Sequence, residues 1–263
     1  MRGACGTCAD CKWYASEHDG KLHARYCQNR TIGGVIRADG GFAEYMLTTD
    51  DAIVRIPESV PWEQAAPLMC AGATVWSAIL ATEAKKDSFM AIVGTGGLGS
   101  LGIQFAKALG YRVVAIGSRD KPSNLDIIPK GIKADLYVNR TADDAEKKLL
   151  DFTNGRGLDS AVVTMDNVSV NDWILHQLHP HGTAVVLGLP EEGYKLDSFN
   201  LVFRQITVKG SLHATREEME EMLRVVAKYK IKSELSPLKL EEAEALPEMT
   251  HNRELPAKAV VLM

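Results

Sequence analysis

Short apolar runs recur along the middle of this chain, and stretches of helical length separate them. Five of the runs occupy residues 91–93, 112–116, 134–138, 160–163 and 183–187. Strands that alternate with helices are typical of a parallel sheet covered by helices. The pattern therefore predicts an α/β fold with a doubly wound parallel sheet.

The pattern extends to both sides of these runs. Residues 41–57 alternate apolar and polar positions and stop at a proline, which predicts extended strands leading out of a β-rich region. Residues 62–84 have the pattern of a helix. After the central runs we expect a last sheet strand at 206–211 and a helix over 215–229. Residues 258–263 predict a final strand that returns to the N-terminal part of the chain.

The helix between the second and third strands has the least support. Pro122 suits the first position of a helix, but Pro129 and Gly131 would end it early. We therefore expect only a weak helix within residues 121–132.

A glycine-rich turn, GTGGLGSLG at residues 94–102, joins an apolar strand to a helix. Gly94 permits a tight turn, Gly96 lets the backbone approach a pyrophosphate, and Gly99 allows close packing of the helix on the sheet. Amides at the helix N-terminus would receive the phosphates. Glycine-rich loops also serve as plain turns, but the change of periodicity here favours a bound dinucleotide of the NAD(P) type.

Composition narrows the classes of partner. A chain of 263 residues with 46% hydrophobic residues can bury a sizeable core in one large or two smaller domains. The net charge of −4 disfavours nucleic acid and anionic membranes as partners. No run approaches the ~20 apolar residues of a membrane span, and the N-terminus is too polar for a signal peptide. We expect a cytoplasmic protein.

Cysteines cluster at the start of the chain, within an otherwise irregular segment over residues 1–40. Cys5, Cys8, Cys11 and Cys27 are four of the five cysteines. In a reducing compartment such clustered thiols indicate metal ligands, and four thiolates suit a tetrahedral structural Zn²⁺ that holds a loop and does no chemistry. The alternative is a set of reduced, unliganded thiols in a mobile tail.

Histidines near these and other motifs are weaker metal candidates. His18 and His23 lie between the third and fourth cysteines, where we expect solvated loop residues. His176, His179 and His181 have metal-like spacing in HQLHPHG. The proline and glycine among them favour a turn from helix to strand instead.

Several motifs together carry a family resemblance. The strings GACGTCADC, DGGFAEYM, AAPLMCAGATVWSAI, VGTGGLGSLGIQFAKALGYRVVAI, VVLGLP and VKGS occur in this order. In that order they resemble the zinc-dependent alcohol dehydrogenases of the medium-chain dehydrogenase/reductase family. The resemblance implies a Rossmann domain over residues 72–213. It also implies a truncated, zinc-stapled, β-rich remnant of the catalytic domain over residues 1–71 plus 214–263.

The resemblance also implies residue roles and an activity. Cys70 in PLMCAGAT resembles the third ligand of the family's catalytic zinc, although its apolar neighbours alone would make it a core cysteine. Cofactor contacts are expected from Thr74, Gly94, Gly96, Gly97, Leu98, Gly99, Gly117, Ser118, Arg119 and Gly188. The implied reaction is NAD(P)-linked hydride transfer between a small alcohol and an aldehyde or ketone, in dimers or tetramers formed through the sheet's edge strand.

Two departures from the family pattern qualify this reading. No Cys-x-Ser/Thr-Asp or Gly-His-Glu string occurs in the 263 residues. Cys70 would then be one protein ligand where a catalytic zinc takes three, so we expect an N-terminally truncated member without a conventional catalytic zinc site.

The second departure concerns the cofactor. Members that bind NAD place an acid at the end of the second strand, and Gly117 stands there. Ser118 and Arg119 suit a 2′-phosphate, which favours NADP. NAD stays open, because a small register shift would bring Asp120 to the acidic position.

Three functional classes follow. The first is an NAD(P)-dependent alcohol dehydrogenase-like enzyme with zinc. The rival is a catalytically impaired dinucleotide-binding pseudoenzyme, or a partner of longer relatives. A zinc-knuckle nucleic-acid binder is disfavoured by the acidic charge and the few aromatic residues among the early cysteines.

Overall fold

The computed structural model describes residues 3–33, 35–41, 43, 45–120, 122, 125–252 and 254–262. Its centre is a parallel sheet with the strand order β3-β2-β1-β4-β5-β6. The strands are β1 (Phe89–Val93), β2 (Arg112–Gly117), β3 (Leu136–Asn139), β4 (Leu158–Val163), β5 (Leu178–Val186) and β6 (Thr207–Gly210). This order confirms the predicted doubly wound sheet, and it changes direction between β1 and β4, where such sheets bind ligands.

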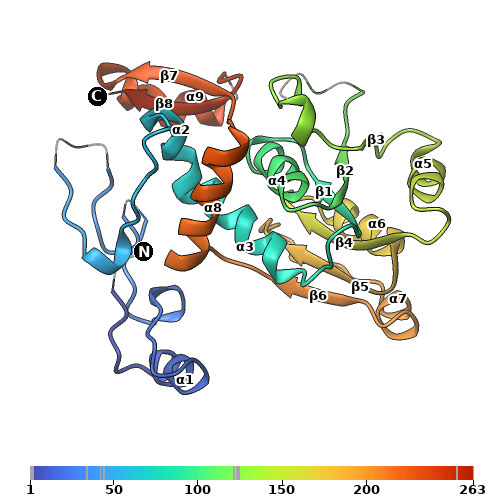
Figure 1. Cartoon of the computed structure of the whole chain (residues 1–263), viewed down its shortest axis with the longest axis horizontal. Coiled ribbons are helices and arrows are strands. Elements are labelled where there is room, and N and C mark those ends of the chain that lie inside the picture. The colour runs from blue at the N-terminus through green and yellow to red at the C-terminus, as the bar shows by residue number, and fades with distance from the viewer. Residues whose placement is uncertain are drawn as a thin grey trace.

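Helices cover both faces of the sheet (Figure 1). One face carries α3 (Ala73–Ala81), α4 (Gly97–Ala108) and α8 (Arg216–Tyr229), and the other carries α5 (Ala145–Phe152) and α6 (Val168–Gln177). Side chains of β1 alternate between two cores: Met90 and Ile92 join the first, and Ala91 and Val93 the second. Burial on both faces explains why β1 is a continuous apolar run. Beyond β5, the short helix α7 (Ser198–Phe203) leads to β6.

The predicted helix at residues 62–84 is one helical run with a π-turn inside it. It consists of α2 (Trp62–Pro67), the turn Leu68–Gly72 and α3, and it ends at Ala81. By length and composition alone, Trp62–Ala81 would suffice to cross a membrane, yet most of this segment is buried inside the protein. Trp76 is fully buried and meets Phe105 of α4 edge to face. The run is therefore a core helix of the fold.

Two strands form a separate C-terminal unit. β7 (Leu235–Lys239) and β8 (Lys258–Leu262) pair in parallel, with α9 (Leu246–His251) between them in sequence. Figure 1 shows this unit beside α2, at the end of the molecule away from α5 and α7. The predicted final strand exists, but among the described residues its pairing partner is β7 and not an N-terminal strand. Leu238 and Val260 are buried in this unit.

The N-terminal segment differs most from its prediction. It contains α1 (Ala9–Glu17), which the expectation of an irregular segment missed because its sequence has almost no apolar periodicity. The strands expected over residues 41–57 are absent from the described residues there, which form one short 3₁₀ turn, Asp50–Ala52. Tyr45 and Leu47 are 90% and 86% exposed. An alternating run becomes a strand only beside a pairing partner, and no described strand pairs with this one.

Local chemistry explains two other boundaries. Thr215 and Glu218 form a capping box that starts α8, where the predicted helix begins. In the described part of residues 121–132 there is no α-helix, and Lys130–Ile132 forms a 3₁₀ turn. The proline before that turn and the glycine within it agree with the weak support for a helix.

Candidate functional site

The glycine turn after β1 is shaped by close contacts that exclude side chains. Gly94 has a φ of +99°, and a Cβ there would lie 2.5 Å from Thr164 Oγ1. A Cβ on Gly99 would lie 1.7 Å from the Gly94 carbonyl oxygen. Gly96 precedes α4 as its N-cap, and a Cβ there would meet no atom within 4 Å. Two of the glycines thus allow close packing, and the third leaves open space above the helix N-terminus.

That open space is part of a cavity of about 640 Å³ at the carboxyl ends of β1 and β2. Seven of the residues expected to contact a cofactor line it: Gly94, Gly96, Gly97, Leu98, Gly117, Ser118 and Arg119. Three do not: Thr74 lies on α3, Gly99 lies behind the turn, and Gly188 packs against the Met165 carbonyl oxygen. The structure therefore brings together the glycine turn and the end of β2.

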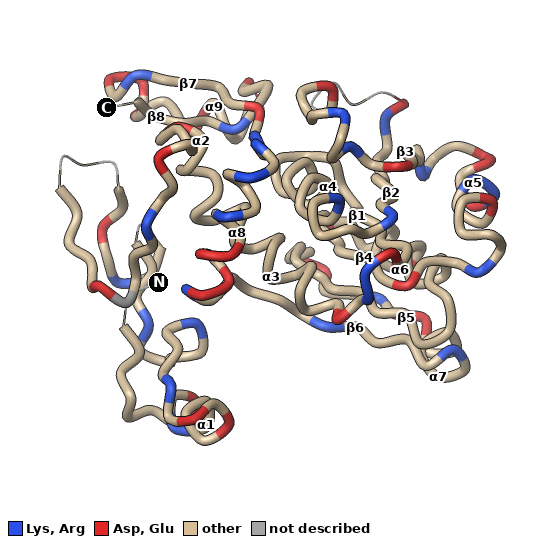
Figure 2. Tube along the Cα trace, in the orientation of Figure 1, with Lys and Arg blue, Asp and Glu red and all other residues tan. Residues whose placement is uncertain are grey.

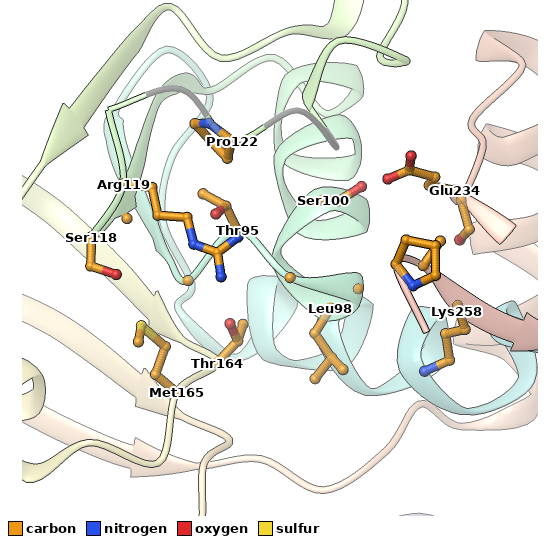
Figure 3. A pocket seen from close by; sticks show the side chains of 17 residues that line it. Thr95, Leu98, Ser100, Ser118, Arg119, Pro122, Thr164, Met165, Glu234 and Lys258 are labelled. Atoms are coloured by element: carbon orange, nitrogen blue, oxygen red, sulfur yellow. The ribbon is translucent and has the colours of Figure 1, made fainter. Parts of the chain in front are cut away.

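The C-terminal unit supplies a wall of the cavity that sequence reasoning missed. Ser233, Glu234 and Lys258 all line it. Figure 3 shows Arg119 entering from the β2 side and Glu234 and Lys258 from the opposite side, with the first turn of α4 between them. The Lys258 side chain passes 3.7 Å from the position of a Cβ on Gly97. No sequence motif marked Lys258, because it reaches the turn only through tertiary packing.

The cavity is lined by two cations, Arg119 and Lys258, and one carboxylate, Glu234, so its charged side chains together favour an anion. The N-terminus of α4 carries unpaired amides and the positive end of the helix dipole. Among the described residues, neither Arg119 nor Lys258 has an ion-pair partner. Over the whole molecule, acidic and basic residues are interspersed (Figure 2). The positive character is thus local to the cavity.

Tyr137 of β3 limits which side chain fits at the end of β2. Its hydroxyl donates to the Arg119 carbonyl oxygen, and it would lie 2.4 Å from a Cβ on Gly117. Burial raises the pKa of Tyr137, so the hydroxyl stays protonated as a donor. Asp120 is outside the cavity lining and accepts a hydrogen bond from Asn139 Nδ2 at 2.8 Å. None of the described acidic residues at this strand end lines the cavity.

Two glutamines hold the segment that precedes β7 against the helices. Gln64 of α2 donates to the Ser233 carbonyl oxygen at 3.2 Å, and its own side-chain oxygen accepts from the Ser233 N–H at 2.8 Å. Gln104 of α4 pairs with Lys232 in the same way. These contacts fix the chain next to Glu234 and so position that wall of the cavity.

The four early cysteines form a second site. Their sulfur atoms all lie within 4.8 Å of one another, and no other group of three or more such ligands occurs among the described residues. Zn–S bonds of about 2.3 Å place the sulfurs of a tetrahedral site about 3.8 Å apart, so only a small contraction separates this cluster from zinc geometry. The donor set therefore fits zinc.

Backbone and side-chain donors already favour thiolates in this cluster. The amides of Cys8 and Asn29 donate to Cys5 and Cys27 at 3.4 and 3.3 Å. Hydrogen bonds from Thr7 and Asn29 lower the pKa of Cys5 to about 5. Burial raises the pKa of Cys11 to about 12. A cation would compensate for the burial of the Cys11 sulfur as a thiolate.

The structure separates the remaining metal candidates from this cluster. Cys70 lies exposed in the π-turn and belongs to no group of three or more ligands among the described residues.

His18 is exposed as expected, but His23 is not a solvated loop residue. His23 is half-buried, its Nδ1 accepts from the Arg25 N–H at 3.0 Å, and burial lowers its pKa to about 4. His179 also belongs to no such group of ligands among the described residues, and its Nε2 lies 2.9 Å from Asp159 Oδ1.

Comparisons with known proteins agree with this architecture. Residues 97–228 match the family model described as zinc-binding dehydrogenase. An alcohol dehydrogenase of Geobacillus stearothermophilus is 34% identical over 240 residues, covering 90% of this chain and 67% of the relative. The crystal structure of an alcohol dehydrogenase from Aeropyrum pernix superposes with a TM-score of 0.80 at 25% identity, covering 99% and 73% of the two chains. Acetophenone reductase from Geotrichum candidum, solved in complex with NAD, gives a TM-score of 0.78 at 25% identity, covering 98% and 70%.

Proposed function

The chain belongs to the zinc-binding dehydrogenase family, and on that premise we propose that it is an oxidoreductase that binds NADP(H) in the cavity beside the glycine turn. The observation that carries this proposal is the placement of Arg119 and Lys258 on opposite sides of the first turn of α4. Two cations that have no ion-pair partner among the described residues, together with a helix N-terminus, suit a ligand with phosphates at two positions.

Each part of the cavity has a role in this proposal. The amides of Gly97 and Leu98, with Lys258, hold the pyrophosphate, and Ser118 and Arg119 hold the 2′-phosphate. When bound, the nicotinamide supplies the hydride chemistry. Contacts from Thr74 and Gly188 stay predictions, because neither residue lines the cavity.

The preference for NADP over NAD rests on the end of β2. An acid at position 117 would collide with the Tyr137 hydroxyl, and Asp120 is engaged by Asn139. Neither position therefore offers a carboxylate to the ribose hydroxyls, as NAD-binding sites of this type do. Arg119 enters the cavity at the same place and would bind a 2′-phosphate.

We further propose that the four-cysteine cluster holds one structural zinc and that the substrate is a small alcohol with its aldehyde or ketone. The substrate class comes from the alcohol dehydrogenases that the chain resembles. The described residues do not fit a catalytic zinc at Cys70, because no further ligands gather there.

That observation favours a second candidate function, which is dinucleotide binding without alcohol turnover by these 263 residues. The experiment that separates the two is an assay of the purified, zinc-loaded chain with NADP⁺ and a panel of primary and secondary alcohols, following NADPH absorbance. Turnover that is lost in Arg119→Ala and kept in Arg224→Ala, an exposed arginine of α8, would support the enzyme. Saturable NADPH binding without turnover would support the second candidate.

A further inference from the structure

A second cavity, of about 520 Å³, lies where the cysteine-bearing segment meets the body of the protein. Arg25 lines it from the short 3₁₀ turn Ala24–Tyr26, Ser77 from α3, and Ser211 from the residue after β6. It shares no lining residue with the dinucleotide cavity. The family comparison and the proposed function leave it unused.

Arg25 is buried in this wall, with its guanidinium 5.2 Å from the centre of the Tyr26 ring and only weak hydrogen-bond acceptors around it. The residue is only 9% exposed, yet its best hydrogen bond is from Nη1 to the Ser77 hydroxyl at 3.4 Å. Its Nη2 lies 3.7 Å from Glu218 Oε2, beyond hydrogen-bond distance, and its Nε is buried with no acceptor among the described residues. The N–H donors of a buried guanidinium normally have hydrogen-bond acceptors. We therefore expect a further acceptor beside Arg25 in this cavity.

Glu218 does not supply this acceptor, because its carboxylate caps the N-terminus of α8. Its Oε2 accepts from the Thr215 N–H at 2.7 Å in the capping box of α8. Its negative charge at the cavity wall disfavours a dianion such as phosphate. A group with a single negative charge and two oxygens matches the guanidinium best.

The remaining walls offer two serine hydroxyls and an apolar surface that suits the hydrocarbon part of an organic ligand. Ser77 Oγ lies 3.4 Å from Arg25 Nη1 and 3.4 Å from Ser211 Oγ, and both serines line the cavity with Arg25. Leu80 and Leu212 supply apolar surface on the same cavity. A pocket with an apolar wall and a few convergent polar groups is the usual form of a small-molecule site.

We propose that this cavity binds a small organic monocarboxylate. The carboxylate accepts hydrogen bonds from Arg25, Ser77 and Ser211, and the hydrocarbon part lies against Leu80 and Leu212. Because Arg25 belongs to the N-terminal segment while the serines belong to the body of the protein, the bound ligand ties the two together.

The test is isothermal titration of sodium benzoate into the zinc-loaded full chain, with inorganic phosphate as the comparison anion. We expect saturable binding at one site per chain, at least tenfold weaker in Arg25→Gln and unchanged in Arg224→Gln. Saturating NADPH should leave it unchanged. No saturable binding to the unmodified chain, equal affinity in Arg25→Gln, or tighter binding of phosphate than of benzoate would overturn the proposal.

A second variant covers the case in which Arg25→Gln fails to fold. Gly210 lines the cavity, and a Cβ there meets no atom within 4 Å, so Gly210→Phe places a ring in open space without a backbone clash. This variant keeps Arg25, Ser77 and Glu218. It should fold as the unmodified chain does and bind benzoate at least tenfold more weakly, and undiminished binding would overturn the proposed site.

Discussion

Gln104 and Lys232 are 128 residues apart in sequence, yet the side-chain amide of Gln104 forms two hydrogen bonds with the backbone of Lys232. Gln104 Nε2 donates to the Lys232 carbonyl oxygen at 2.8 Å, and the Lys232 N–H donates to Gln104 Oε1 at 3.1 Å. The Gln104 side chain is fully buried in α4. The helix that presents the glycine turn therefore also holds the segment that carries Glu234 into the cavity.

Gln104→Leu removes both hydrogen bonds and leaves the Lys232 amide and carbonyl without partners. We expect a loss of about 1–3 kcal/mol in the free energy of unfolding, measured by urea denaturation, because the two bonds are partly buried and each contributes about 0.5–1.5 kcal/mol. NADPH affinity should fall as well. Gln177→Leu is the matched control, since Gln177 is buried on α6 away from the cavity and should leave NADPH affinity unchanged. Unchanged stability in Gln104→Leu would contradict the role of this pair.

The two glycines of the turn should respond differently to alanine. In Gly99→Ala the new methyl collides with the Gly94 backbone, so we expect a destabilisation of about 3 kcal/mol or more. In Gly96→Ala the methyl enters open space, so the stability should be unchanged while NADPH binding weakens about tenfold, or about 1.4 kcal/mol. Urea denaturation and fluorescence titration separate the two effects. Equal losses of stability in both variants would show that the open space at Gly96 has no special role.

Zinc content should depend on four of the five cysteines. We expect about one zinc per chain by elemental analysis of the purified protein, because a four-sulfur cluster makes one closed site. Cys27→Ser should lose the metal, and Cys70→Ser should keep it. Two tightly bound zinc ions per chain, or loss of zinc in Cys70→Ser, would mean that Cys70 belongs to a metal site.

Tyr137 should control which acid the end of β2 can carry. Gly117→Asp alone is expected to weaken the binding of both NADPH and NADH, since the new side chain meets the Tyr137 hydroxyl. Adding Tyr137→Ala relieves that collision and should shift preference toward NADH, because a carboxylate can then accept from the ribose hydroxyls. Titration of both nucleotides into both variants measures this shift. NADH binding that does not improve in the double variant would contradict the steric explanation.

Local sequence signals predicted most of the sheet and part of the site. The strands of the central sheet and the glycine turn follow from apolar runs and from glycines whose contacts are nearby in sequence. The start of α8 follows from the chemistry of Thr215 and Glu218. The cysteine spacing likewise indicated a cluster, and the four sulfurs do lie together.

The features that were missed depend on contacts between distant segments. Lys258 reaches the glycine turn only because β8 pairs with β7, and no periodicity encodes that pairing. The role of Tyr137 at Gly117 depends on the register of β3 against β2. Residues 41–57 have a strand-like pattern without a described partner strand, which shows that alternation alone does not make a strand.

The proposal that this cavity selects NADP(H) is tested most directly by titrating NADPH and NADH separately into the purified chain and following nucleotide fluorescence. We expect NADPH to bind at least about tenfold more tightly than NADH, a difference of about 1.4 kcal/mol, and Arg119→Ala to remove that difference. Tighter binding of NADH, or no saturable binding of either nucleotide, would contradict the proposal.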